Sequence, residues 1–375
     1  MMMASEKEMA GAMITKATFK NFRGFRDLTL DGLRRINLIV GDNSSGKTAL
    51  MEGLFLGSAP SPQAALSLRQ FRGYAPPQGP MSIPTFLALW EDLFLGFQIE
   101  NEIEIALSGT ETGGDTFRRV LRIGKAKDGT ITVPFSPPAE AQVGTPNAAF
   151  TNISFEWRAQ QGKQPETAAT IVPQMTPVGL LMGQAPGNIP SAILPARMGF
   201  APDLAAENFT DLVRNNKKKQ FIDKMRELFP GLLDMDAGYE QGHGLLLAHV
   251  KGLDRAILAS LFSDGFGRIA EILLLIAKVS GGFVLIDEIE NGIFFKRYGN
   301  VLKAIDAFSR EFATQIFLTT HSDGIRYALA ENLMSDDENF SVIRCYREEN
   351  GDTNARIVSG ERAKYALESG IELRV

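Results

Sequence analysis

The chain contains few of the residues that form disulfides or bind transition metals. Its 375 residues include one cysteine, Cys345, and three histidines, His243, His249 and His321. A single cysteine excludes an intramolecular disulfide and is typical of a protein from a reducing compartment. The histidines are too widely spaced to form a Cys/His metal motif. Disulfide-stabilised folds and zinc modules are therefore excluded.

Long apolar runs and an excess of positive charge are also missing. No apolar stretch reaches the roughly 20 residues that a membrane-spanning helix needs. Residues 1–13 include Glu6, Lys7 and Glu8 and have no apolar core, which argues against a secretory signal. With a net charge of −5, any contact with nucleic acid must be local. We therefore expect a cytoplasmic protein without membrane contact, in which residues 1–12 form a mobile extension.

The most informative feature that the chain does have is a phosphate-binding motif. Residues 41–48 read Gly-Asp-Asn-Ser-Ser-Gly-Lys-Thr, which fits G-x-x-x-x-G-K-[ST] at every fixed position. An apolar, β-branched segment precedes the motif at 36–40, and a segment with helical character follows it at 49–56. This order of strand, glycine loop and helix predicts a Walker A motif that binds a nucleoside triphosphate.

The residues of this loop have individual predicted roles. Their backbone N–H groups would surround the phosphates at the positive end of the following helix dipole. Lys47 would contact the β- and γ-phosphates, and Thr48 would ligate Mg²⁺. The ATP-binding residues predicted from this loop are Gly41, Asn43, Ser44, Ser45, Gly46, Lys47, Thr48 and Ala49.

A second motif supplies acidic groups at the end of a strand. Residues 283–286 are all apolar and are followed by Asp287 and Glu288, which is the pattern of a Walker B strand. Asp287 would hold Mg²⁺ together with Thr48. Glu288 would polarise the attacking water as general base. The apolar strand that follows ends near His321, which matches the switch histidine of cassette ATPases and is the third predicted catalytic residue with Lys47 and Glu288.

A third motif opens the helix before the Walker B strand. Ser263, Asp264 and Gly265 resemble the signature loop of ATP-binding cassette proteins, in which a serine hydroxyl at a helix N-terminus contacts a γ-phosphate. An ordinary helix cap is the alternative interpretation. The long separation between Lys47 and Asp287 implies that a segment is inserted between the two halves of the nucleotide fold.

With these motifs in order, the chain resembles a family of cytosolic cassette ATPases. The family includes RecF, the heads of structural-maintenance-of-chromosomes (SMC) proteins and, most similar, the ATPase module of the overcoming-lysogenisation-defect (OLD) nucleases. Residues 19–25 resemble its N-terminal strand and turn. Residues 287–292 with 319–322 carry the OLD-like pattern, and 368–374 resemble the end of that module. The segment after His321 is too short for the Toprim nuclease domain of the OLD proteins.

The resemblance implies an α/β fold, a P-loop NTPase of the ABC-ATPase type. It implies a mixed central sheet, an N-terminal antiparallel β lobe and an irregular, partly helical insertion. After the extension at 1–12, we expect a first lobe with Walker A at 13–128 and an insertion or arm at 129–245. A second lobe with signature, Walker B and switch histidine follows at 246–375. Within the first lobe, alternating apolar residues predict a strand over 96–107.

The resemblance also implies a mechanism. Two chains would form a head-to-head homodimer around two ATP·Mg²⁺ complexes, each phosphate loop facing the Ser263–Gly265 loop of the other chain. With no effector domain of its own, the ATPase would control a separately encoded effector protein, in bacterial anti-phage defence.

Two alternatives stay open. One is a RecF-like repair ATPase that clamps DNA, and the other is a scaffold stabilised by ATP that hydrolyses it very slowly. DNA could be held in a groove formed by Lys16, Lys20, Arg23, Arg26, Arg118, Arg119, Arg122, Lys125 and Lys127.

Overall fold

The computed structural model describes most of the chain. The described residues are 11–59, 61–74, 83–111, 113–126, 153–176, 179–183, 185, 187–196, 201–334, 336 and 338–369. Three predictions fall partly outside them: the extension at 1–12, the first part of the insertion up to residue 152, and the OLD-like ending from residue 370.

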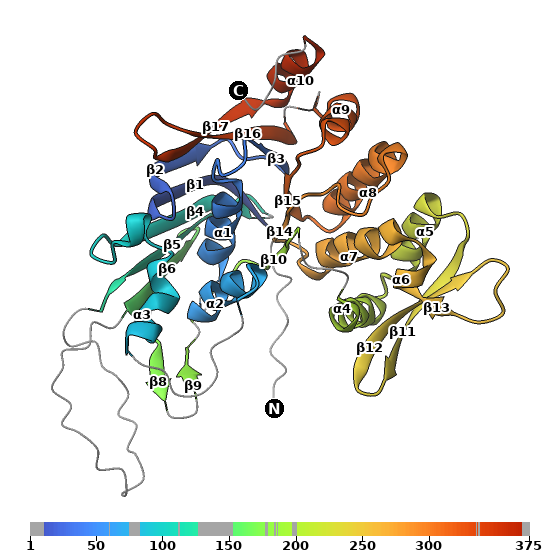
Figure 1. The fold of residues 1–375 in the computed structure, drawn as a ribbon, viewed down its shortest axis with the longest axis horizontal. Helices are drawn as coiled ribbons and strands as arrows, with labels where there is room; N and C mark the ends of the chain where they lie inside the picture. The colour runs from blue at the N-terminus through green and yellow to red at the C-terminus, as the bar shows by residue number, and fades with distance from the viewer. Residues whose placement is uncertain are drawn as a thin grey trace, which may run out of the picture.

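An antiparallel sheet of six strands forms the first lobe, at the left of Figure 1. Its strands, in spatial order, are β2 (Phe25–Asp31), β1 (Ala12–Phe22), β4 (Ile103–Glu111), β5 (Thr116–Lys125), β6 (Ile153–Gln161) and β7 (Thr167–Ile171). Along β4 buried residues alternate with half-buried ones, as expected for a sheet with one face on the core. The predicted N-terminal antiparallel lobe is confirmed.

A second, mixed sheet forms the centre of the molecule. Its strands, in spatial order, are β10 (Ser191–Leu194), β14 (Phe283–Ile286), β15 (Gln315–Thr319), β3 (Ile36–Val40), β16 (Phe340–Arg347) and β17 (Thr353–Ser359). The first five run parallel and β17 is antiparallel to β16. Val284 and Ile286 of β14 face one hydrophobic core, and Phe283 and Leu285 face the other. The mixed α/β fold class predicted from the sequence is confirmed.

Helices cover both faces of the central sheet (Figure 1). The first core includes residues of α4 (Pro202–Arg214), α5 (Lys218–Leu228), α7 (Asp264–Lys278), α8 (Tyr298–Glu311), α9 (Asp323–Asn332) and α10 (Gly360–Glu368). The second core includes residues of α1 (Lys47–Ser58), α2 (Pro62–Phe71) and α3 (Ile83–Glu91). No helix among the described residues is long and apolar enough to cross a membrane.

The remaining elements are short or lie at the periphery. They are α6 (Ala259–Phe262), β8 (Gln174–Thr176), β9 (Gly179–Leu181), β11 (Leu232–Glu240), β12 (His243–Val250), β13 (Ile257–Leu258) and the 3₁₀ turns η1 (Leu95–Phe97) and η2 (Phe295–Arg297). The described part of the predicted insertion is distributed over several units, because β6 and β7 join the first sheet and β10 joins the central one. The boundaries at residues 128 and 245 stay a prediction.

The predicted strand over 96–107 is wrong in its first half. Gly96 and Phe97 both have a φ of 60°, in the left-handed region, and belong to the turn η1. Strand β4 begins only at Ile103. Alternation of apolar residues cannot detect such a turn, because it says nothing about backbone dihedral angles.

A buried glutamine joins the two sheets. The Gln315 Nε2 group donates hydrogen bonds to the carbonyl oxygens of Ile14, at 2.8 Å, and Arg34, at 2.7 Å. Its Oε1 atom accepts a hydrogen bond from the Ile14 N–H at 3.0 Å. One side chain of β15 therefore satisfies backbone groups of β1 and of the segment that leads into β3.

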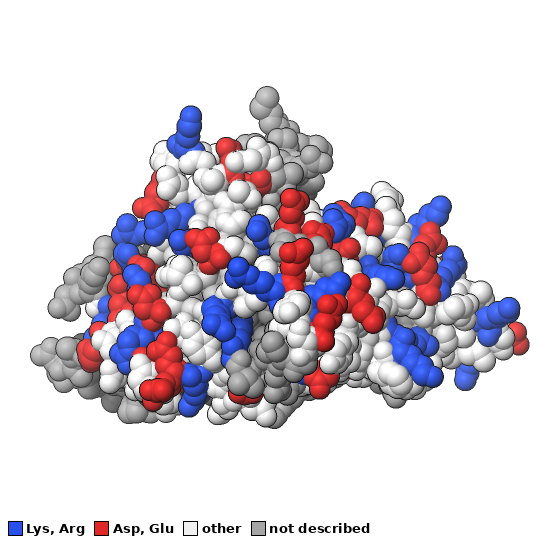
Figure 2. Space-filling model, turned by 90° about the horizontal axis from the view of Figure 1, so that it is seen from above, with Lys and Arg blue, Asp and Glu red and all other residues white. Residues whose placement is uncertain are grey.

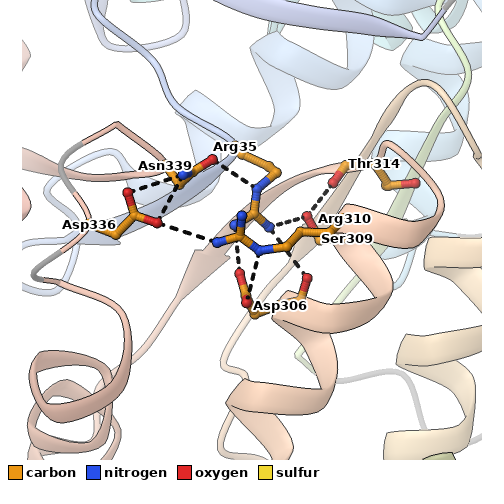
Figure 3. A network of polar contacts seen from close by, with 7 residues as sticks. All are labelled: Arg35, Asp306, Ser309, Arg310, Thr314, Asp336 and Asn339. Atoms are coloured by element: carbon orange, nitrogen blue, oxygen red, sulfur yellow. Dashed lines mark hydrogen bonds and ion pairs between the residues drawn. The ribbon is translucent and has the colours of Figure 1, made fainter.

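A polar network fixes the end of β3 that is opposite to the phosphate loop (Figure 3). The Arg35 guanidinium contacts Asp306 Oδ1 at 2.6 Å, Ser309 Oγ at 2.8 Å and Asn339 Oδ1 at 3.2 Å. Arg310 joins Asp306 to the segment before β16, through its ion pair with Asp336. The network connects the start of β3 with α8 and with the start of β16.

We expect Gln315→Met to lower the free energy of unfolding by about 3 kcal/mol, because it leaves buried backbone groups of Ile14 and Arg34 without partners. Denaturant titration would measure the change. Gln160→Met, the same replacement at an exposed strand position, is the control and should change stability by less than about 0.5 kcal/mol. Equal stability of both variants would contradict the role of Gln315.

Candidate functional site

The phosphate loop connects β3 to α1 and depends on two glycines. Gly41 and Gly46 have φ values of 145° and 97°. A Cβ on Gly41 would lie 2.3 Å from the carbonyl oxygen of Cys345, and one on Gly46 would lie 2.3 Å from Thr353 Cγ2. The loop is therefore packed against β16 and β17, and any side chain at either glycine would displace it.

The lysine of the motif lies inside the loop. The buried Lys47 ammonium group donates hydrogen bonds to the carbonyl oxygens of Gly41 and Asp42, both at 2.8 Å. Ser45 is also buried, and its hydroxyl has no hydrogen-bond partner among the described residues. A positive charge and the N-terminus of α1 thus occupy the same loop, an arrangement that attracts an anion.

The two acidic residues after β14 are positioned by a threonine of β15. The Thr319 hydroxyl donates to Asp287 Oδ1 at 2.7 Å and accepts from the Glu288 N–H at 2.8 Å. Glu288 has a φ of 49°, a left-handed conformation that costs a non-glycine residue about 1 to 3 kcal/mol. Asn291 Nδ2 donates to Glu288 Oε2 at 2.9 Å. These bonds hold the Glu288 carboxylate in one orientation despite the strained backbone.

The histidine after β15 lies beside the same carboxylate. His321 Nε2 is 3.8 Å from Glu288 Oε1. The His321 N–H donates to Glu290 Oε1 at 2.6 Å, and the Thr320 hydroxyl donates to Glu290 Oε2 at 2.7 Å. Glu290 therefore fixes the backbone that carries His321. The roles of Glu290 and Thr319 were not predicted from the sequence, because the Walker B pattern ends at Glu288 and a strand threonine has no distinctive signal.

One cavity of about 770 Å³ brings these motifs together. Of the predicted site residues, its lining includes Asn43, Ser44, Gly46, Lys47, Thr48, Ala49, Asp287, Glu288 and His321. Thr48 and Asp287, the predicted Mg²⁺ ligands, share this cavity. No group of three or more His, Cys, Asp or Glu side chains among the described residues could hold a metal alone. A divalent ion here would need further oxygens from a nucleotide.

Ser263 and Gly265 of the predicted signature loop are not part of this lining and lie at the start of α7. Ser263 precedes α7 as its N-cap, but its side chain makes no capping hydrogen bond. Asp264 is the first residue of the helix. A Cβ on Gly265 would lie 2.9 Å from the carbonyl oxygen of Gly292, so the start of α7 packs closely against the loop after Glu288.

Two further charged residues of α7 are buried behind the Walker B strand. Arg268 Nη2 donates to the carbonyl oxygen of Asp287 at 3.1 Å. Burial lowers the pKa of the Arg268 guanidinium and raises the pKa of Glu271 to about 7. Arg268 therefore connects the helix that starts at Ser263 with the backbone of the predicted metal ligand. Nothing in the sequence distinguished these residues from charges on the exposed face of a helix.

The single cysteine is inert. Cys345 is buried in β16, and burial raises the pKa of its thiol to about 12. A neutral thiol is a poor nucleophile, so the cavity offers no cysteine chemistry.

Two family models match the chain. Residues 151–326 match a family described as "AAA domain, putative AbiEii toxin, Type IV TA system". Residues 16–62, which include the phosphate loop, match a family described as "AAA domain". Both descriptions name an AAA domain, and together with the geometry of the cavity these matches show that the chain is an ATPase.

Individual proteins are similar over different lengths. A Helicobacter pylori protein named "ATP/GTP phosphatase" is 21% identical over 375 residues, which cover 95% of this chain and 98% of the relative. An uncharacterised protein of Methanocaldococcus jannaschii is 46% identical over 44 residues, 12% of this chain and 20% of the relative.

The solved structures that match the chain include SMC heads. An SMC head bound to the C-winged helix domain of ScpA has a TM-score of 0.49 at 14% identity, covering 93% of this chain and 99% of that chain. The SMC head domain from Thermotoga maritima has a TM-score of 0.42 at 14% identity, covering 92% and 98%.

We expect Thr319→Val to lower kcat for ATP hydrolysis by about 10- to 100-fold, because Asp287 and Glu288 lose the hydroxyl that orients them. ATP affinity should change much less, since Thr319 does not line the cavity. Steady-state hydrolysis and equilibrium nucleotide binding would separate the two effects. Thr319→Ser, which keeps the hydroxyl, should retain most of the activity. A Val variant with unchanged kcat would rule out this role of Thr319.

Proposed function

We propose that this chain is an ATP-hydrolysing subunit whose head-to-head homodimerisation is driven by ATP and controls a separately encoded effector. One observation carries the proposal. The chain places its phosphate loop, Asp287, Glu288 and His321 around one cavity, but Ser263 and Gly265 of its predicted signature loop are not part of the lining of that cavity. A second copy that presents its own signature loop would complete the site.

The predicted catalytic and metal-binding residues of the cavity have separate tasks in this proposal. Lys47 and the start of α1 bind the β- and γ-phosphates. Thr48 and Asp287 hold Mg²⁺, which when bound neutralises phosphate charge that develops during hydrolysis. Glu288 accepts a proton from the attacking water, and His321, 3.8 Å from that carboxylate, marks the γ-phosphate end of the cavity.

Exposed apolar side chains near the signature loop support an interface there. Leu261, Phe294 and Phe295 are 70%, 58% and 60% exposed. Leu261 lies two residues before Ser263, and the phenylalanines follow Gly292, which packs against Gly265. The two phenylalanine rings contact each other with centroids 4.7 Å apart. A second copy would remove this apolar surface from water.

The printed descriptions of similar proteins support the remaining parts of the proposal, the effector and the defence role. The name of the Helicobacter pylori relative refers to ATP and GTP, which fits a nucleotide-hydrolysing subunit. The description of the matched family refers to a toxin of a type IV toxin–antitoxin system, which fits an ATPase that acts beside a partner in bacterial defence. The cytoplasmic location and the specific similarity to OLD proteins also stay predictions.

Direct DNA binding is less favoured, because most of the cations that would form the groove are paired. Lys16 pairs with Asp31, Lys20 with Glu104, Arg23 with Glu52 and Asp92, Arg26 with Asp352, Arg122 with Glu104, and Lys125 with Glu100. Arg119 is buried, and Lys127 lies outside the described residues. On the face shown in Figure 2, acidic and basic side chains are intermixed. Phosphates would have to compete with these carboxylates.

We expect the Glu288→Gln variant to form an ATP-dependent dimer, with twice the 41.0 kDa mass of the monomer, because it binds ATP·Mg²⁺ but cannot hydrolyse it. Light scattering after size-exclusion chromatography would measure the mass. The double variant with Lys47→Ala is the control and should stay monomeric with ATP. An assembly that is indifferent to nucleotide would overturn the proposal and favour the scaffold alternative.

In the Glu288→Gln background, we expect Phe294→Ser with Phe295→Ser to raise the dimer dissociation constant at least about tenfold, since four rings per dimer lose apolar burial. ATP binding to the monomer should stay within about twofold, because neither ring lines the cavity. Tyr365→Ser is the matched control, because it removes an exposed aromatic side chain from α10, which is not part of the proposed interface. This variant should leave the dimer intact. A dimer unaffected by the double replacement would place the interface elsewhere.

A further inference from the structure

The proposed nucleotide site has two sides, which the order of the central strands defines. Asp287 and Glu288 follow β14, and His321 follows β15, on one side of β3. The hairpin of β16 and β17 lies on the other side of β3. Because the proposed hydrolytic groups mark the γ-phosphate end, we expect the nucleoside of a bound triphosphate to extend away from them, and this hairpin lies on that side of β3.

The hairpin of β16 and β17 contacts the phosphate loop and the turn between β1 and β2. Arg347 Nε donates to the carbonyl oxygen of Ser44 at 3.3 Å. The Thr353 N–H donates to the carbonyl oxygen of Gly24 at 2.9 Å. A Cβ on Gly24 would lie 2.5 Å from Thr353 Oγ1, which leaves room only for glycine. Gly24, Ser44, Arg347 and Thr353 all line the cavity, so this wall combines the β1–β2 turn, the loop and the hairpin.

Arg347 is the one residue of this four-residue wall with a large planar group. Its side chain is exposed, and its guanidinium can present a flat face to a nucleobase while Nε stays bonded to the loop. We propose that Arg347 binds the base of the nucleotide by stacking, and that the site therefore accepts purine nucleoside triphosphates in general, ATP and GTP alike. This inference rests on the proposed function. Stacking is tolerant of base identity because every base has a π face.

The opposite wall of the cavity, formed by α2 and the residues after it, is the competing location for the base. It contains two aromatic residues, Phe71 and Tyr74. The Arg69 guanidinium lies over the Tyr74 ring, 5.1 Å from its centroid. Phe71 packs edge-on against Phe55 with centroids 6.2 Å apart. Both rings already have a planar group against them, whereas the Arg347 guanidinium lies over no ring of the described residues and is bonded only through Nε, which favours the Arg347 side.

Equilibrium binding of ATP, GTP and inorganic tripolyphosphate, each with Mg²⁺, would test the inference. For Arg347→Ala we expect about fivefold weaker binding of ATP and GTP, and tripolyphosphate binding within about twofold of wild type. Arg347→Lys should behave like the alanine variant, because it keeps the charge but lacks the planar face. Arg356→Ala removes an exposed cation from the same hairpin without touching the cavity lining, and should change none of the three.

Three results would overturn the inference. Equal loss of ATP, GTP and tripolyphosphate would make Arg347 a phosphate ligand or a support of the loop. Unchanged binding in Arg347→Ala, with weaker ATP and GTP binding in Tyr74→Leu, would place the base on the α2 side. A wild-type preference for one purine above about tenfold would contradict base tolerance. If the wild-type chain bound none of the three ligands, the proposed function itself would fail, which is a distinct result.

Discussion

The position of β3 in the centre of the parallel sheet is the constraint on which the site depends. Asn37, buried in β3, donates from Nδ2 to the carbonyl oxygen of Ile316 at 3.2 Å, and its Oδ1 accepts from the Ser341 hydroxyl at 2.8 Å. One side chain thus holds the neighbouring strands β15 and β16 against β3. The glycine loop follows β3, the predicted switch histidine follows β15, and Arg347 ends β16. This polar contact in an apolar core therefore adds to the backbone pairing that fixes their relative positions.

Polar side chains of β15 connect this arrangement of strands with the antiparallel lobe and with the two carboxylates of the cavity. Gln315 joins the start of β15 to β1, and Thr319 at its end orients Asp287 and Glu288. The central strand β15 therefore connects the antiparallel lobe with the acidic end of the cavity. Arg268 adds a contact from α7 to the Asp287 backbone.

The sequence predicted the elements with strong local signals. The strands at 36–40 and 283–286 and the helix after the phosphate loop are present where the apolar runs and the glycine motif indicated them. The strand expected at 96–107 was wrong before Ile103, because Gly96 and Phe97 take up left-handed backbone angles. Residues 153–171 were expected in an insertion, but they extend the antiparallel sheet, since strand pairing depends on distant partners.

The sequence by itself determined that the chain has a phosphate-loop motif and an apolar strand that ends in two carboxylates, because these motifs need fixed residue types at short, fixed spacing. It thereby predicted the residues of nucleotide hydrolysis. Only the tertiary structure decided which residues support them. Thr319, Glu290, Arg268 and Arg347 act on the motifs from other elements of the chain, and such residues have no local pattern. The structure also leaves Ser263 and Gly265 outside the cavity lining of their own chain, because the start of α7 packs against the loop after Glu288.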